Sequence, residues 1–200
     1  MKIIQLNSTC DMGSTGKICR SISEHLAEID IENYIFYTQG NSNYPLGKKY
    51  SHKAYVKLQA LKSRILGNGG FNSSLATRKL IRQLDEVRPE IIHIHNIHSH
   101  DCNLSMLFEY IRESNTKVIW TFHDCWAFTA NCPHFSIARC DKWKSECRKC
   151  PQIRDTSWFF DRSHILFNKK KQLFTAIPNM TIVTPSEWLA KLVKQSFLHN

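Results

Sequence analysis

The sequence predicts an α/β fold: a Rossmann-like, mostly parallel β-sheet with helices on both faces. Short apolar segments of β-rich composition alternate along the chain with longer segments in which apolar residues recur every three or four positions. Polar motifs follow several of the expected strands, and in parallel sheets wrapped by helices ligands bind at the carboxyl ends of the strands. Because 200 residues suit one α/β domain, we expect a single domain over residues 1–200.

The first third of the chain begins with a β-rich apolar run at 2–7, which predicts a strand, followed by a loop. Isoleucines and leucine at helical spacing then predict a helix over 17–29. The run YIFYT predicts a second strand over 34–38. Residues 39–72 carry five of the seven glycines and are expected to be irregular around a basic helix at about 54–66.

The middle of the chain continues the alternation. Apolar spacing predicts a helix over 73–88, with Ser73 or Ser74 as its cap and a proline just past its end. The run EIIHIHN predicts a strand over 90–96, and NLSMLFEYIRES predicts a helix over 103–114.

The last third contains one interruption. A strand is expected over 117–124, followed by a cysteine-rich insertion at about 125–152. A helix over 157–177, a strand over 180–186 and a serine-capped helix over 186–197 complete the chain.

The composition is that of an ordinary globular domain with an excess of positive charge. Hydrophobic residues make up 42% and charged residues 22%, and the net charge is +10 with histidines neutral. This excess is either a solvated surface or a sign of nucleic acid, an anionic membrane or anionic small molecules such as sugar nucleotides. The densest basic run, FNKKKQ at 167–172, is short and no nucleic-acid-binding motif occurs, so we expect no nucleic-acid partner.

The N-terminus has the pattern of a strand and not of a signal peptide. No stretch approaches the roughly 20 apolar residues of a membrane span. We therefore expect a cytoplasmic protein, whose thiols stay reduced.

The first motif is GSTGK, between the first expected strand and helix. Glycines here let the backbone approach a ligand, and the helix N-terminus offers N–H donors and positive potential. It is neither a Walker A loop nor G-x-G-x-x-G, and a tight turn without ligand is the alternative. The candidate substrate-binding residues are Gly13, Ser14, Thr15, Gly16 and Lys17.

The second motif is IIHIHNIHSH, at the end of the expected strand 90–96. His93 and His95 alternate and therefore share one face of that strand. Their position predicts that His95, Asn96 and His98 line a binding site, although a lone core histidine is usually structural. A catalytic metal is a minor alternative, for which Asp101 and the histidine of the next motif are available.

The third motif is TFHDCW, at the end of the strand expected over 117–124. His123 and Asp124 can reach the same crevice, and a histidine beside an aspartate suggests acid–base chemistry. Adjacent residues on a strand point to opposite faces, so ligand contact is the safer expectation. A fourth motif, TPSEWLA, follows the last strand, and the serine there is a helix cap with no ligand needed to explain it.

Four cysteines lie in nineteen residues of the insertion. The spacing Cys147-x2-Cys150 is half of a tetrahedral zinc site, and two further thiols can complete it. Seven residues lie between Cys132 and Cys140 rather than two to four, so reduced thiols and disulfides stay open as alternatives, and Cys125 could substitute for one ligand. The candidate ligands of a structural zinc are Cys132, Cys140, Cys147 and Cys150.

HIHNIH, TFHDCWAFT, C-x2-CP and TPSEWLA, in this order and spacing, resemble glycosyltransferase family four, and in particular bacterial members that build colanic acid, capsule and other surface polysaccharides. These are retaining, nucleotide-sugar-dependent enzymes of the GT-B fold. The resemblance implies that Gly13 and Gly16 lie near the donor phosphates and the acceptor. Ser14 replaces a glycine found in many members. His123 matches a histidine that faces the donor sugar, which makes it the candidate catalytic residue.

GT-B enzymes have two Rossmann-like domains with the active site between them. The second domain, which binds most of the nucleotide and carries a glutamate pair spaced E-x7-E, is absent from this sequence. We therefore expect the N-terminal, acceptor-side half, which should not transfer sugar efficiently alone.

The resemblance implies transfer of a hexose-type sugar from a nucleotide-sugar donor to a hydroxyl of a surface-polysaccharide acceptor, with retained configuration. No cofactor is expected to be required for catalysis. A lipid-linked acceptor would bring the basic surface to the inner face of the cell membrane. The alternative is a non-catalytic module that binds a glycan or a partner protein.

Overall fold

The computed structural model describes residues 1–98 and 100–199. Its centre is one six-stranded, all-parallel sheet. In sheet order the strands are β3 (Gly47–Lys49), β2 (Glu32–Tyr37), β1 (Lys2–Leu6), β4 (Ile91–Ile94), β5 (Lys117–Thr121) and β6 (Met180–Val183). The Rossmann-like α/β fold is thus confirmed, and every strand of this sheet is parallel.

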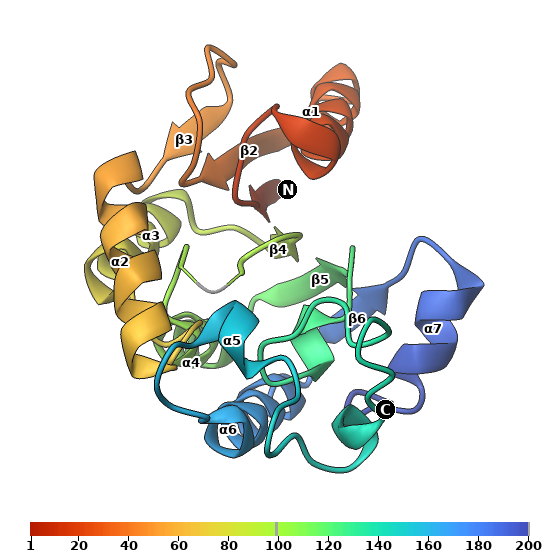
Figure 1. Cartoon of the computed structure of the whole chain (residues 1–200). Coiled ribbons are helices and arrows are strands. Elements are labelled where there is room, and N and C mark those ends of the chain that lie inside the picture. The colour runs from red at the N-terminus through yellow and green to blue at the C-terminus, as the bar shows by residue number, and fades with distance from the viewer. Residues whose placement is uncertain (99, 200) are drawn as a thin grey trace.

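Helices cover both faces of the sheet, as Figure 1 shows, with α1 on one face and α3, α4 and α6 on the other. The α-helices of the described chain are α1 (Gly13–Glu28), α2 (Lys53–Leu66), α3 (Ser74–Val87), α4 (Leu104–Ser114), α5 (Ile153–Thr156), α6 (Ser163–Thr175) and α7 (Glu187–Val193). None of these helices is long and apolar enough to cross a membrane.

The main core lies between the sheet and helices α3, α4 and α6. Its centre is an aromatic group in which Phe108 of α4 and Trp120 of β5 both contact Phe174 of α6. The ring centroids are 4.5 and 4.9 Å apart, respectively. A smaller core on the α1 side joins Cys19 to Ile35 of β2. This packing fixes the strand ends on which the polar motifs stand.

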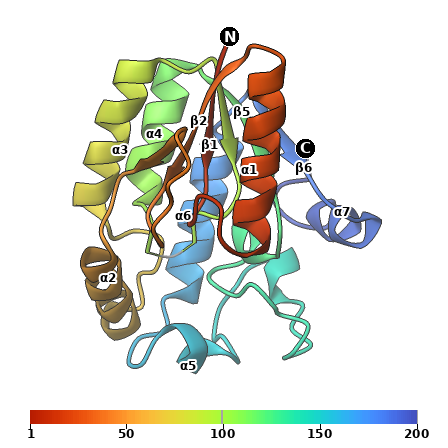
Figure 2. The same cartoon turned by 90° about the horizontal axis from the view of Figure 1, so that it is seen from above.

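All strands point the same way, so their carboxyl ends form one edge of the sheet. Figure 2 shows the N-terminus of α1, helix α2, helix α5 and the cysteine-rich segment gathered at that edge. The motifs predicted from the sequence therefore meet in one region, as the fold class requires.

Four local expectations differ from the structure. Helix α1 starts at Gly13 and not at 17, so the GSTGK motif is its first turn. The three-residue strand β3 lies in the segment expected to be irregular. Ser73 has a φ of 59° and does not cap α3; its hydroxyl donates to the His100 carbonyl. Helix α6 begins at Ser163 rather than 157, where Asp161 accepts a hydrogen bond from the Ser163 amide.

One expected cap is confirmed. The Ser186 side chain accepts a hydrogen bond from the Leu189 amide at 3.3 Å and begins α7. TPSEWLA is thus a helix start, in line with the simplest interpretation of that motif.

Candidate active site

The GSTGK motif is held against the end of β1 by Asn7. The Asn7 side-chain amide donates to the Thr9 carbonyl at 2.8 Å and to the Thr15 hydroxyl at 3.4 Å, and its oxygen accepts from the Asn96 amide at 3.2 Å. A Cβ at Gly16 would lie 2.7 Å from the Thr9 hydroxyl, so glycine is required there. The first turn of α1 and the end of β4 are thereby fixed to each other.

The first turn of α1 presents backbone N–H groups at the carboxyl edge of the sheet. It contains no acidic residue, and Ser14 and Lys17 are exposed. This end of α1 can therefore accept an anionic group such as a phosphate.

Behind this turn, a hydrogen-bonded chain fixes the tautomer of His123. The Gln5 amide nitrogen donates to the Cys19 carbonyl at 2.9 Å, which turns the Gln5 oxygen towards His95. His95 must then donate from Nε2, and its neutral ring accepts at Nδ1 from His123 Nε2 at 3.1 Å. The lone pair of a neutral His123 is consequently on Nδ1, where it can accept a hydrogen bond or a proton.

Burial keeps these imidazoles neutral. Burial, followed by the charges of His93 and His123, lowers the pKa of His95 to about 2. Burial and the charge of His123 lower the pKa of His93 to about 4. The pKa of His123 is lowered by burial and by His98, against the opposite effect of Asp124. His95 is only 2% exposed and both its ring nitrogens are bonded, so the geometry favours support of His123 over direct substrate contact.

His98 and Asp124, both predicted site residues, are in hydrogen-bond contact with 3.2 Å between Nε2 and Oδ2, and the contact is an ion pair when His98 is protonated. The other Asp124 oxygen accepts from the Trp126 amide at 2.8 Å, and the His98 ring lies 5.0 Å from the Trp126 ring. Burial alone would raise the pKa of Asp124, but the hydrogen bond and charge of His98, with the Trp126 amide, bring it below its usual value. Asp124 therefore stays ionised and holds His98.

Asp101, considered above as a metal ligand, is a structural connection. It is buried and accepts hydrogen bonds from the Ser8 hydroxyl at 2.7 Å, the Thr38 hydroxyl and the Gln39 side chain at 3.1 Å. These contacts join the ends of β1 and β2 to the segment after β4.

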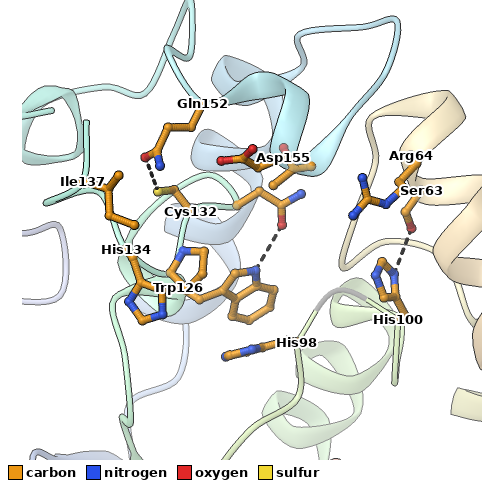
Figure 3. Close-up of a pocket in the computed structure, with 13 residues that line it drawn as sticks. Ser63, Arg64, His98, His100, Trp126, Cys132, His134, Ile137, Gln152 and Asp155 are labelled. Atoms are coloured by element: carbon orange, nitrogen blue, oxygen red, sulfur yellow. Dashed lines mark hydrogen bonds between the residues drawn. The ribbon is translucent and has the colours of Figure 1, made fainter. Parts of the chain in front are cut away.

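A pocket of about 290 Å³ lies beside these residues, between α2, α5 and the cysteine-rich segment. Figure 3 shows His98 and Trp126 on one side and Arg64 of α2 on another, with Asp155 between the segments. The indole nitrogen of Trp126 donates to the Asn131 side chain at 3.0 Å. Of the predicted site residues, the pocket contains His98 and Cys132. Residues 13–17 and His123 lie outside it.

Lys170 is a supporting residue that the sequence reasoning did not find. It is fully buried on α6 and donates to the carbonyls of Trp126 at 2.8 Å and Thr129 at 3.3 Å. Its nitrogen also lies 3.3 Å from the centre of the Trp126 ring. Lys170 falls three residues after Phe167 and four before Phe174, both buried, so its place on the inner stripe of α6 was the available signal.

The four cysteines of the insertion do not form a metal site as placed. Burial, with smaller contributions from neighbouring thiols, raises the pKa of Cys132 and Cys147 to about 11, and the Cys132 thiol donates to the Gln152 side chain. All eight cysteines are free thiols. Across residues 1–98 and 100–199, no three His, Cys, Asp or Glu side chains are arranged to hold a metal ion. Zinc binding would require these thiols to move together and lose protons, and it stays a prediction.

A comparison with models of protein families identifies the family of the chain. The model of Glycosyltransferase Family 4 matches residues 15–197. The chain belongs to glycosyltransferase family 4. No curated protein matches the sequence. Membership in glycosyltransferase family 4 implies glycosyltransferase activity in general terms, and the match includes the end of the GSTGK motif, the histidine strand ends and the cysteine-rich segment.

Proposed function

We propose that this chain is the acceptor-side domain of a retaining GT-B glycosyltransferase that moves a hexose-type sugar from a nucleotide-sugar donor to a hydroxyl of a surface-polysaccharide acceptor. The observation that carries the proposal is the meeting of three elements at one sheet edge in a chain of this family: the N-terminus of α1, His123 with a fixed tautomer, and the pocket beside His98. No cofactor is needed for the chemistry proposed.

Different groups of this chain are proposed to contact the leaving diphosphate, the donor sugar and the acceptor sugar. The N-terminus of α1 would stabilise the departing diphosphate, because backbone N–H groups there meet developing negative charge. His123 Nδ1 would hold a hydroxyl of the donor sugar. The pocket, which Arg64 and Asp155 both line, would hold the acceptor sugar.

A second, nucleotide-binding domain is proposed to complete this site, which would leave residues 1–200 alone with little activity. Reading the gene beyond codon 200 tests this directly, since a continuing frame should encode a second βα-alternating domain with E-x7-E. The protein encoded by the whole gene should then be assayed with a panel of nucleotide sugars. Proton NMR of the product would show the same anomeric configuration as the donor, and inversion would refute retention.

Replacing His123 by Ala in the whole-gene protein is expected to lower kcat by about 100-fold or more, because a positioned hydrogen-bonding group at the reacting sugar is lost. Initial transfer rates measure this. His25→Ala, at an exposed position on α1, is the matched control and should retain the wild-type rate. A His123→Ala variant with unchanged kcat would remove His123 from the catalytic site.

The cysteine-rich segment is proposed to shape the acceptor pocket without taking part in chemistry, since Cys132 lines that pocket. If structural zinc stabilises the segment, protein purified without chelator should carry one zinc per chain by native mass spectrometry. Cys147→Ser with Cys150→Ser should abolish that mass difference, while Cys10→Ser, a buried cysteine elsewhere, should not. An apo mass with free thiols would exclude zinc.

The proposed acceptor is lipid-linked, which would place the protein at the inner face of the cell membrane. The net charge of +10 supports contact with anionic lipid.

A further inference from the structure

Helix α2 has its polar and apolar faces reversed relative to an ordinary surface helix. Of its three buried residues, Gln59 and Ser63 are polar, and both form hydrogen bonds inside the fold. Leu58, Leu61 and Ile65 are exposed instead, and Leu58 is 57% exposed. Spaced three and four residues apart, these three side chains form one apolar stripe on the outer face of α2.

A second group of exposed apolar side chains lies at the C-terminal end of α2. Trp158, Phe159 and Phe160, in the turn between α5 and α6, are 49%, 70% and 50% exposed, respectively. The rings of neighbours in this run meet edge to face at 6.5 Å. Three consecutive exposed large aromatic side chains are unusual on a monomeric surface and indicate a binding site.

The two groups form a continuous surface because the backbone joins them. The Trp158 amide donates to the Arg64 carbonyl at 2.7 Å, and a Cβ at Gly67 would lie 2.5 Å from the Phe160 carbonyl oxygen. The turn is thus packed on α2 by its backbone, which leaves its aromatic side chains directed outwards. We name the six side chains Leu58, Leu61, Ile65, Trp158, Phe159 and Phe160 the docking surface.

The α2 side of the docking surface is flanked by positive charge. Helix α2 carries Lys53, Lys57, Lys62 and Arg64 and no acidic residue. Residues 153–162 add two arginines and two aspartates. One of those aspartates, Asp161, accepts hydrogen bonds from two backbone amides, so its carboxylate is already partly neutralised by these donors.

We infer that the docking surface binds the surface of an anionic phospholipid bilayer, with the apolar side chains in the interface and the cations of α2 at the headgroups. An exposed apolar stripe flanked by Lys and Arg, joined to a Trp–Phe cluster, is the pattern of interfacial helices. A second copy of the chain fits poorly, because a twofold contact would bring two acid-free basic helices together. Lysine is also depleted in protein–protein interfaces.

The acceptor pocket opens next to the docking surface. Ser63 and Arg64 of α2 and Thr156 of α5 line the pocket, and the same two helices carry or adjoin the docking surface. A sugar on a lipid anchor could therefore reach the pocket while the bilayer contacts α2. This last step rests on the proposed function, whereas bilayer binding itself does not.

The experiment is a vesicle co-sedimentation series on the wild-type chain at about 150 mM salt. Vesicles of phosphatidylcholine alone are compared with vesicles that contain about 30% phosphatidylglycerol. We expect binding to the anionic vesicles at least about tenfold tighter. Brominated lipid should quench Trp158 fluorescence, and the quenched fraction should fall in Trp158→Phe.

Variants locate the contact. Trp158→Ser with Phe159→Ser, and separately Lys57→Gln with Lys62→Gln, should each weaken anionic-vesicle binding about tenfold or more. All four side chains are exposed, so the fold should survive, which circular dichroism checks. The matched control on α7, Trp188→Ser with Lys191→Gln, changes the same residue types at exposed positions and should bind as wild type.

Absence of binding to both vesicles, equal loss in the α7 control, or unchanged binding in both surface variants would each overturn the inference. So would concentration-dependent dimerisation that Trp158→Ser abolishes in a chain that binds no vesicle. Vesicle binding without sugar transfer would leave the docking surface standing and count against the proposed function. Transfer to a soluble acceptor without vesicle binding would support the proposed function and overturn the docking surface.

Discussion

Lowering the pH from about 6.5 to about 4.5 is expected to remove about 4 kcal/mol of folding stability through two histidines. Burial lowers the pKa of His95 to about 2 and that of His93 to about 4, so both rings stay neutral in the folded chain over most of this range. In the unfolded chain the same rings take up protons below about pH 6.5. The unfolded state therefore binds more protons. As the pH decreases, the free energy of unfolding decreases by about 1.4 kcal/mol per pH unit for each histidine.

Urea unfolding followed by circular dichroism at several pH values between 7.5 and 4.5 measures this slope. Aspartates with lowered pKa, such as Asp124 and Asp161, lose their contribution at lower pH, near and below 4. His93→Gln should reduce the slope by about half, and adding His95→Gln should leave only the smaller part that comes from His123, whose pKa burial also lowers. His52→Gln, at an exposed position, should leave it unchanged. A wild-type stability that is flat from pH 6.5 to 4.5 would contradict the buried neutral pair.

Lys170→Met is expected to lower the free energy of unfolding by about 3 kcal/mol. The substitution keeps the length of the side chain but removes the donor of the buried Thr129 carbonyl. The Trp126 carbonyl loses its shortest hydrogen bond and keeps only the 3.4 Å contacts from the Thr129 amide and hydroxyl. Each unsatisfied buried group costs about 1–3 kcal/mol, and relief of the buried charge offsets part of this. Burial lowers the pKa of Lys170 well below its usual value, while Asp124 and Cys147 oppose that shift.

The matched control is Lys171→Met, one residue away on the exposed face of α6. It should change stability by no more than about 0.5 kcal/mol. Because Trp126 lines the pocket, Lys170→Met should also raise the KM for the acceptor in the whole-gene protein, whereas Lys171→Met should not. Equal stability of the two variants would show that the Lys170 hydrogen bonds contribute nothing net.

Several features could be read from the sequence because they depend on short-range patterns. The alternation of strand and helix periodicities is local, and it was enough to predict the parallel sheet and the gathering of motifs at one edge. The placement of His93 and His95 on one face followed from the period of a strand, and their rings lie 4.1 Å apart. The helix cap at Ser186 could be predicted because its hydrogen-bond partner, the Leu189 amide, is only three residues further along the chain.

Other features depended on contacts between distant segments. GSTGK is a poor helix former, yet it begins α1 because Asn7 of the preceding segment bonds Thr15 and the Thr9 hydroxyl donates to the Met12 carbonyl. His95 is a support and not a surface residue because Gln5 lies on β1 and His123 lies just after β5, the two strands on either side of β4. Sequence spacing cannot say which strands flank β4.

The sequence by itself therefore determined the fold class, the order of the main helices and strands without β3 and α5, and the edge at which the site lies. Only the tertiary structure decided which face of α2 is buried, that Lys170 supports Trp126, and that Trp158, Phe159 and Phe160 remain exposed. The physical reason is that periodicity fixes which residues share a face, whereas burial of that face depends on what packs against it. In α2 the polar side chains Gln59 and Ser63 are buried because they form hydrogen bonds inside the fold, and the apolar stripe of the helix is therefore exposed.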